Sequence, residues 1–154
     1  MRMLLLTLLT TLLLATASHA QEPCVSKIRT YLQQGGYAAI EASPCKVWLV
    51  NGLFSFKAQG EGLQGLLLVG VEDDIVVIGT VVRPKALAGL GQHQLIQLLR
   101  QNNDLDYVKI GLDKDGDLFV RAELRVTHLT SDDFSQTVRQ VIAGGNRVYE
   151  LLRQ

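Results

Sequence analysis

Three aspartates alternate within residues 113–117, around Gly116, and carboxylates at such a spacing are candidate calcium ligands. An EF-hand calcium loop needs oxygen ligands at positions 1, 3 and 5, glycine at position 6 and a bidentate glutamate at position 12. Counting from Asp113 puts Leu124 at position 12, and aligning Gly116 with position 6 puts Ala122 there. Because neither register supplies the glutamate, we interpret the stretch as a turn and keep a calcium-stabilised module as an alternative.

The residues on either side of this stretch alternate between apolar and polar, as the two strands of a hairpin would. A three-residue loop over 114–116 pairs Leu112 with Leu118 and Ile110 with Val120, so that apolar side chains oppose each other. A two-residue turn would oppose Ile110 to a charged side chain instead. The sequence therefore predicts the three-residue loop, with Gly116 left-handed in a bulge.

The same register gathers four charged side chains, Lys109, Arg121, Glu123 and Arg125, on the opposite face of the sheet. Alternating charges on neighbouring strands are typical of a solvated face with cross-strand ion pairs. The alternative is a small extracytoplasmic hydrolase or ligand-binding protein that uses Arg121, Glu123 and Arg125. The pattern fixes no second carboxylate beside Glu123, which general acid–base catalysis by a carboxylate pair would need.

No other catalytic arrangement stands out in the sequence. Beyond the first twenty residues the only histidines are His93, in a glutamine-rich segment, and His128, at the end of a predicted strand. There is no Gly-x-Ser-x-Gly nucleophile motif and no phosphate-binding glycine loop. We therefore predict that the protein is not an enzyme, with no catalytic residue, no bound metal and no cofactor.

The first twenty residues are typical of a secretory signal peptide. Arg2 provides the positive start, an apolar run follows over 4–14, and Ser18 and Ala20 are the small residues of a cleavage site. Cleavage after Ala20 would deliver a mature chain to the periplasm or the exterior, and we expect residues 21–154 to form a single domain.

The mature chain carries almost no net charge. Removal of Arg2 leaves 14 of the 15 basic side chains against 15 acidic ones, and no basic run is present. Nucleic acid is therefore not an expected partner. No further apolar stretch is long enough to cross a bilayer, so we expect no membrane insertion after cleavage.

Cys24 and Cys45 are the only cysteines, and both follow the cleavage site. In an oxidising compartment two cysteines are most simply a disulfide. Closure of this loop would stabilise the fold by roughly 3 kcal/mol through restriction of the unfolded chain.

The apolar periodicity predicts an α+β fold: an antiparallel sheet of about five strands, with helices near the N-terminus, in the middle and at the C-terminus (α-β-β-β-α-β-β-α). Asn51-Gly52 is a strong turn signal and predicts a hairpin that pairs Leu49 with Phe54 and Val47 with Phe56. A helix over about 88–102 would bury Leu95, Ile96, Leu98 and Leu99. Another begins at Thr130 or Ser131, both good N-caps, and is weakened at Gly144 and Gly145.

Two runs, 66–71 and 75–82, are apolar at nearly every position, which indicates strands covered on both faces. The cover is either a crossing helix or a second copy of the chain, and we favour a homodimer. Taking Val47 and Leu49 as core-facing leaves the other face as the predicted interface. Its residues are Trp48, Val50, Leu67, Val69, Val76 and Ile78.

The second half of the chain resembles the YbjN family, whose members share the fold of class I type III secretion chaperones. The resemblance spans most of 25–153 and is most specific over 95–142, through LLRQNNDL, the LDKDGDLFV hairpin and LTSDDFSQTVRQVI. Within these motifs it rests on Leu98, Leu99, Asn102, Gly116 and the Thr130-Ser131 helix start.

This resemblance implies a non-enzymatic fold that is often dimeric and that, in the chaperone branch, holds extended segments of client proteins. The sequence departs from that branch by its export signal, its predicted disulfide and its lack of an acidic bias. We therefore expect an exported, non-enzymatic protein-interaction or chaperone-like module with a possible protein client.

Overall fold

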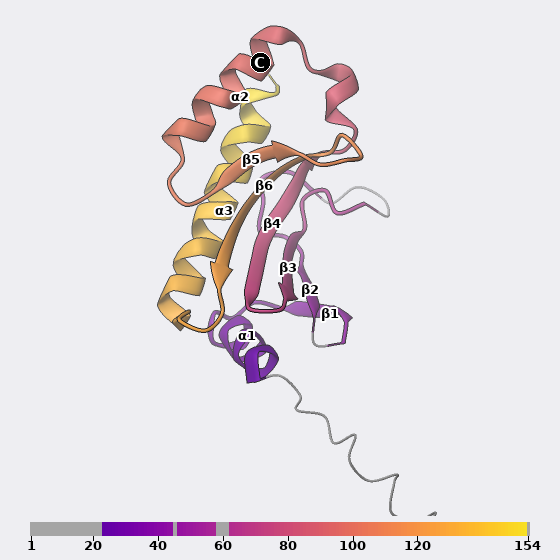
Figure 1. The fold of residues 1–154 in the computed structure, drawn as a ribbon. Coiled ribbons are helices and arrows are strands. Elements are labelled where there is room, and N and C mark those ends of the chain that lie inside the picture. The colour runs from indigo at the N-terminus through magenta and orange to yellow at the C-terminus, as the bar shows by residue number, and fades with distance from the viewer. Residues whose placement is uncertain (1–22, 45, 58–61, 154) are drawn as a thin grey trace, which may run out of the picture.

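The computed structural model describes residues 23–44, 46–57 and 62–153 (Figure 1). Its helices are α1 (Pro23–Gln34), α2 (Gln92–Asp104) and α3 (Ser131–Leu151), with a short 3₁₀ helix η1 (Ala86–Gly89). Its strands are β1 (Ala39–Ser43), β2 (Val47–Val50), β3 (Leu67–Glu72), β4 (Ile75–Arg83), β5 (Lys109–Leu112) and β6 (Leu118–Arg125). None of the helices in the described part of the chain has the length and apolar composition needed to span a bilayer.

The strands form one antiparallel sheet in the order β1-β2-β3-β4-β6-β5. Figure 1 shows α3 running behind the sheet, α1 at one end of the molecule and α2 at the other. The predicted α+β class is confirmed, with six strands in place of about five, because four strands precede α2 where three were expected.

The predicted hairpin at Asn51-Gly52 is wrong. β2 pairs with β1 on one side and with β3 on the other, so no edge of β2 is left for residues 53–57. Gly52 has a positive φ of 79° and turns the chain, which then leaves the sheet. Phe56 stacks on Tyr149 of α3 with 4.7 Å between ring centroids. The alternating aromatic residues Phe54 and Phe56 therefore do not form a strand, and the segment packs against α3 instead.

The predicted interface is also wrong. Trp48, Val50, Leu67, Val69, Val76 and Ile78 are each at most 2% exposed and belong to the core of the chain itself. They lie on the face of the sheet that α3 covers. With the hairpin absent, the assignment of faces in β2 is inverted: Val47 and Leu49, expected in the core, lie on the opposite face and are partly exposed.

The N-terminus of α3 is fixed by a reciprocal cap, as the sequence predicts. Thr130 accepts a hydrogen bond from the backbone N–H of Asp133 at 3.1 Å, and the Asp133 carboxylate accepts from the Thr130 backbone and hydroxyl. This satisfies helix N–H groups that otherwise lack partners.

The β5–β6 hairpin has the predicted register. Leu112 pairs with Leu118 and Ile110 with Val120, and Gly116 has a φ of 80°. The loop is therefore residues 114–116, held by a hydrogen bond from the Asp113 N–H to the Asp117 carbonyl at 3.1 Å.

Candidate functional site

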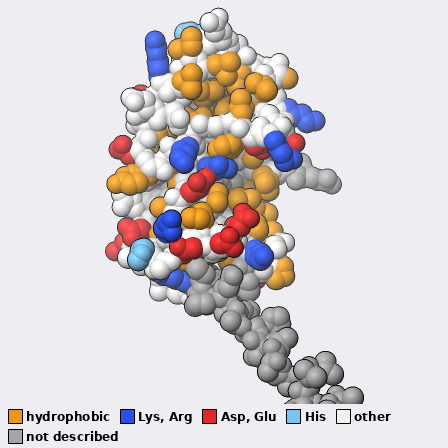
Figure 2. Space-filling view, viewed as in Figure 1, with side chains coloured by type: hydrophobic (Ala, Val, Ile, Leu, Met, Phe, Trp, Pro, Cys, Tyr) orange, Lys and Arg blue, Asp and Glu red, His pale blue; other side chains and the backbone are white. Residues whose placement is uncertain are grey.

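A groove between α2 and β5 has an almost entirely apolar lining and a volume of about 310 Å³. Its lining residues are Leu95, Leu98, Leu99, Asn102, Ile110, Gly111, Leu112 and Leu118. Figure 2 shows hydrophobic side chains gathered over this end of the molecule, in the upper part of the view. The groove is an apolar hollow on the described surface and a candidate site for protein contact.

The groove exists because α2 does not bury the side of the helix that its sequence marks as apolar. Leu98 is buried, but Leu99 is 71% exposed and Ile96 is 42% exposed. The expectation that these residues form a buried helix side is therefore wrong. α2 lies beside β5, where the Asn102 side chain accepts a hydrogen bond from the Ile110 N–H at 2.9 Å. The helix is thus attached at the sheet margin rather than over the sheet.

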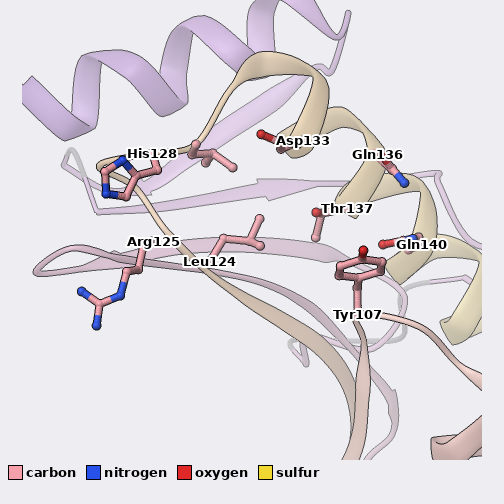
Figure 3. Close-up of a pocket in the computed structure, with 9 residues that line it drawn as sticks. Tyr107, Leu124, Arg125, His128, Asp133, Gln136, Thr137 and Gln140 are labelled. Atoms are coloured by element: carbon pink, nitrogen blue, oxygen red, sulfur yellow. The ribbon is translucent and has the colours of Figure 1, made fainter.

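A second hollow, of about 280 Å³, lies between the end of β6 and the first half of α3 (Figure 3). Its lining residues are Tyr107, Leu124, Arg125, His128, Leu129, Asp133, Gln136, Thr137 and Gln140. Figure 3 shows Gln136, Thr137 and Gln140 on α3 across from Leu124 and Tyr107, with the Arg125 side chain pointing away. The hollow therefore combines the apolar side chains of Leu124 and Leu129 with amide and hydroxyl groups from α3 and with the ionisable side chains of Arg125, His128 and Asp133.

The acidic groups near this second hollow are already engaged in structure. The hydrogen bond from the Thr130 hydroxyl is the main cause that lowers the pKa of Asp133. The Asp74 carboxylate accepts hydrogen bonds from the Thr127 hydroxyl and from the Thr127 N–H, and the first of these is the main cause that lowers its pKa. Both carboxylates favour the ionised form, and neither has the raised pKa of a general acid.

The four charged residues of the sheet lie together on its open face, as the register predicts (Figure 2). Glu123 lies 2.9 Å from Arg121 and 3.9 Å from Lys109, and Arg125 lies 3.7 Å from Asp74. This is the ion-paired, solvated face that the sequence analysis favours. The Glu123 carboxylate is held between two cations outside both hollows.

Two of the three aspartates of residues 113–117 accept hydrogen bonds from backbone N–H groups. Asp113 Oδ1 accepts hydrogen bonds from the N–H groups of Asp115 and Asp117, each at 2.9 Å. Asp117 Oδ1 accepts from the Lys85 N–H at 2.7 Å and so ties the hairpin to the segment before η1. Within the described residues no group of three or more His, Cys, Asp or Glu is arranged to hold a metal.

Cys24 and Cys45 are the remaining residues to which the sequence assigns a role, a disulfide. Cys24 falls in α1, and Cys45 lies outside the described residues, so the proposed disulfide lies outside them too. No motif in the sequence indicates the second hollow, because its lining residues come from three separate segments of the chain. The apolar residues of α2 were the sequence feature that could have indicated the groove, although we expected them to lie in the core.

Comparison with known structures identifies the fold. YbjN from E. coli superposes with a TM-score of 0.62 at 21% sequence identity, covering 84% of this chain and 91% of that one. A chain of the heterodimeric ExoU–SpcU complex from the type III secretion system of Pseudomonas aeruginosa gives 0.59 at 20% identity, covering 80% and 96%. The chain has the fold of YbjN and of type III secretion chaperones.

A third solved structure, which also contains a type III secretion chaperone, has a similar fold. A chain from the complex of the Yersinia pestis type III secretion chaperone SycH with a stable fragment of YscM2 gives a TM-score of 0.55 at 14% identity, covering 81% of this chain and 98% of that one. No protein-family model and no curated protein matches the sequence. The likeness therefore concerns the fold, and function must be argued from the surfaces of this chain.

Proposed function

We propose that this protein is an exported, non-enzymatic, chaperone-like module that binds other proteins and acts as a homodimer. Two of the structures with its fold are complexes of two different proteins, ExoU with SpcU and SycH with a fragment of YscM2. The described surface offers apolar and hydrogen-bonding hollows suited to polypeptide, and several of its ionisable groups are taken up in caps and ion pairs.

The observation that carries the proposal is the apolar groove between α2 and β5. Leu99 at its rim is 71% exposed and Leu112 is 36% exposed. Each square ångström of apolar surface withdrawn from water contributes about 25 cal/mol to association, so a surface of this kind favours a protein partner.

We assign this groove to a second copy of the chain. A two-fold axis brings the same residues of both copies together, so a self-associating surface must not repel itself. Arg100 and Asp104 are the charged residues of α2, and they have opposite signs. The other polar residues of the helix are chiefly glutamine and asparagine, whose amides both donate and accept hydrogen bonds. Such a helix is compatible with its own copy.

Export is supported by the first twenty residues, which have the charge, apolar run and cleavage residues of a signal peptide. We propose cleavage after Ala20 and function in the periplasm or outside the cell. A chaperone fold there would act on exported proteins, in an oxidising compartment that permits a disulfide between Cys24 and Cys45.

The homodimer is tested by the mass of the mature protein in solution, measured by sedimentation across the micromolar range. Leu99→Glu should give a monomer, because two-fold contact would bury the new carboxylates against each other. Ile40→Glu is the matched control: Ile40 is also 71% exposed but lies on β1, away from the groove. A monomeric wild-type protein contradicts the dimer. Loss of the dimer in Ile40→Glu alone would move the interface to the open face of the sheet.

A further inference from the structure

Asn51-Gly52, where the chain turns out of the sheet, is the one asparagine–glycine pair in the sequence. Such a pair favours an intramolecular reaction, in which the backbone nitrogen of the glycine attacks the side-chain carbonyl carbon of the asparagine. Glycine has no side chain to obstruct this attack, which closes a five-membered succinimide ring. A folded protein permits the reaction only where that nitrogen lies close to the side chain and is accessible.

The structure holds the two reacting groups of this pair together. The Gly52 N–H donates a hydrogen bond to Asn51 Oδ1 at 2.7 Å. Because a carbonyl bond is about 1.2 Å long, the nitrogen lies within about 4 Å of the carbon that it must reach. Reacting atoms in a near-attack arrangement are about 3–3.5 Å apart, so the approach that remains is small.

The pair is also accessible and unstrained. Asn51 and Gly52 are both exposed, and no atom beyond the chain neighbours lies within 4 Å of the position that a Cβ of Gly52 would take. Gly52 has a φ of 79°, which glycine adopts without steric cost. Solvent water can therefore reach the ring once it has closed.

Asp115-Gly116 is a related pair, since aspartate can close the same ring, but its geometry differs. The Gly116 N–H donates to the Asp113 carbonyl at 3.1 Å, so it is engaged away from the side chain of its own pair. The Asp115 carboxylate lies 3.1 Å from Lys114 Nζ, and an ionised carboxylate resists attack by a nucleophile. The fold therefore disfavours ring closure at this second pair.

The other three asparagines lie in helices, Asn102 and Asn103 in α2 and Asn146 in α3. A helical main chain directs the next N–H along the helix axis, away from the side chain. Asn102 and Asn146 also accept hydrogen bonds from backbone N–H groups of other segments. Asn103 is exposed like Asn51, so exposure alone does not distinguish the two.

We infer that Asn51 is a site of spontaneous deamidation in the folded protein. The Gly52 nitrogen forms a bond to Asn51 Cγ, the Cγ–Nδ2 bond breaks, and the Gly52 proton leaves with the amide group as ammonia. Water then opens the ring at one of its two carbonyls. Opening at the side-chain carbonyl gives aspartate, and opening at the main-chain carbonyl gives isoaspartate, whose main chain is longer by a methylene group. Both products replace a neutral amide with a carboxylate.

Isoaspartate at position 51 should loosen the segment that follows it. The chain is fixed before this position, where Val50 pairs with strands on both sides. It is fixed again at Ser55, whose N–H donates to the Asn146 side chain at 2.6 Å. A longer main chain between two fixed points displaces one of them. Since β2 has a strand on each side, residues 53–57 are the part that moves on α3.

The test incubates the mature protein in mildly alkaline buffer and follows each asparagine by peptide mapping, with fragmentation that distinguishes isoaspartate from aspartate. The same protein unfolded in guanidinium gives the rates without structure. Asn51 should react in the folded protein within about tenfold of its rate in the unfolded chain, because no opening of the structure is needed. Asn102 and Asn146 react only after local opening and should be slowed at least about a hundredfold by folding.

Two variants separate the reaction from its consequence. Asn51→Gln should suppress the modification at this position, because the longer side chain does not close a five-membered ring. Asn51→Asp carries the new charge on a main chain of normal length. The isoaspartate-containing wild-type fraction, isolated by ion exchange, should melt several degrees below both unreacted protein and Asn51→Asp.

Three outcomes would contradict the inference. A folded-state rate at Asn51 below the expected range would show that the fold protects the pair. Product at Asn103 that forms as fast as at Asn51 would show that exposure, rather than the geometry of the pair, governs the reaction. Equal melting of the isoaspartate fraction and Asn51→Asp would show that the longer main chain does not loosen residues 53–57.

Discussion

A Cβ atom on Gly145 would lie 2.8 Å from Cε1 of Phe54. This contact explains why the segment after β2 folds over α3: the missing side chain at Gly145 makes room for the Phe54 ring, and the next residue, Asn146, accepts a hydrogen bond from the Ser55 N–H at 2.6 Å. Gly145, which weakens α3 as an isolated helix, is therefore what lets the 51–57 segment pack on it.

Gly145→Ala should destabilise the protein, although alanine is the better helix former. The added methyl group overlaps the Phe54 ring and also approaches Thr80 at 3.1 Å, so we expect a loss of about 1–3 kcal/mol in the free energy of unfolding. Gly144→Ala is the control, since its nearest side-chain atom lies at 3.2 Å, and its loss should be smaller. Chemical denaturation measures both, and equal stabilities would refute the role of the Phe54 contact.

Asp113→Ala should lower the melting temperature by a few degrees, because it leaves the amides of Asp115 and Asp117 without their acceptor. Asp115→Ala is the matched control: its carboxylate contacts the exposed side chain of Lys114, and such surface pairs contribute little. Millimolar calcium should leave the wild-type melting temperature unchanged. A calcium-dependent rise of several degrees that disappears in Asp113→Ala would restore the calcium-stabilised alternative.

The stability of the protein should fall in acid through Asp74. The pKa of this carboxyl is lowered in the folded state, chiefly by the Thr127 hydroxyl and also by Arg125. A lowered folded pKa stabilises the protein above the unfolded value near 3.8, and this contribution is lost as the pH falls through the folded pKa. Unfolding midpoints measured between pH 6 and pH 2 should therefore drop less steeply in Asp74→Asn than in the wild-type protein.

Asp133 should behave in the same way, since the Thr130 hydroxyl is the main cause of its lowered pKa. Asp133→Asn should likewise make the unfolding midpoint fall less steeply between pH 6 and pH 2, while the contribution of Asp74 to this fall remains. Identical pH profiles for all three proteins would show that these carboxyls titrate alike in the folded and unfolded states.

The exported protein should begin at Gln21 and contain no free thiol. Intact mass under non-reducing, denaturing conditions should correspond to residues 21–154 less two hydrogens, and alkylation should add nothing until a reductant opens the Cys24–Cys45 bond. Reduction should also lower the melting temperature, because the loop constraint on the unfolded chain is removed. Recovery of two reactive thiols, or of a chain that keeps its first twenty residues, would contradict the corresponding proposal.

The sequence determined the features that depend on neighbours along the chain. The register of the β5–β6 hairpin follows from which residues alternate around Gly116, and the start of α3 follows from Thr130 and the acidic residues after it. The α+β class and its order of helices and strands, with one strand more than expected, follow from the same local periodicity.

Tertiary structure alone decided which face of each element is covered. A period of two shows that Trp48 and Val50 share a face, but whether that face is core or surface depends on where α3 lies. Likewise the apolar residues of α2 predict a helix with an apolar side, and only its attachment at the margin of the sheet leaves Leu99 exposed. The pairing of β6 is decided in the same way: β4 pairs with it from Leu118 to Arg125, whereas β5 pairs only with Leu118–Arg121, and the length of each pairing depends on segments that are distant in sequence.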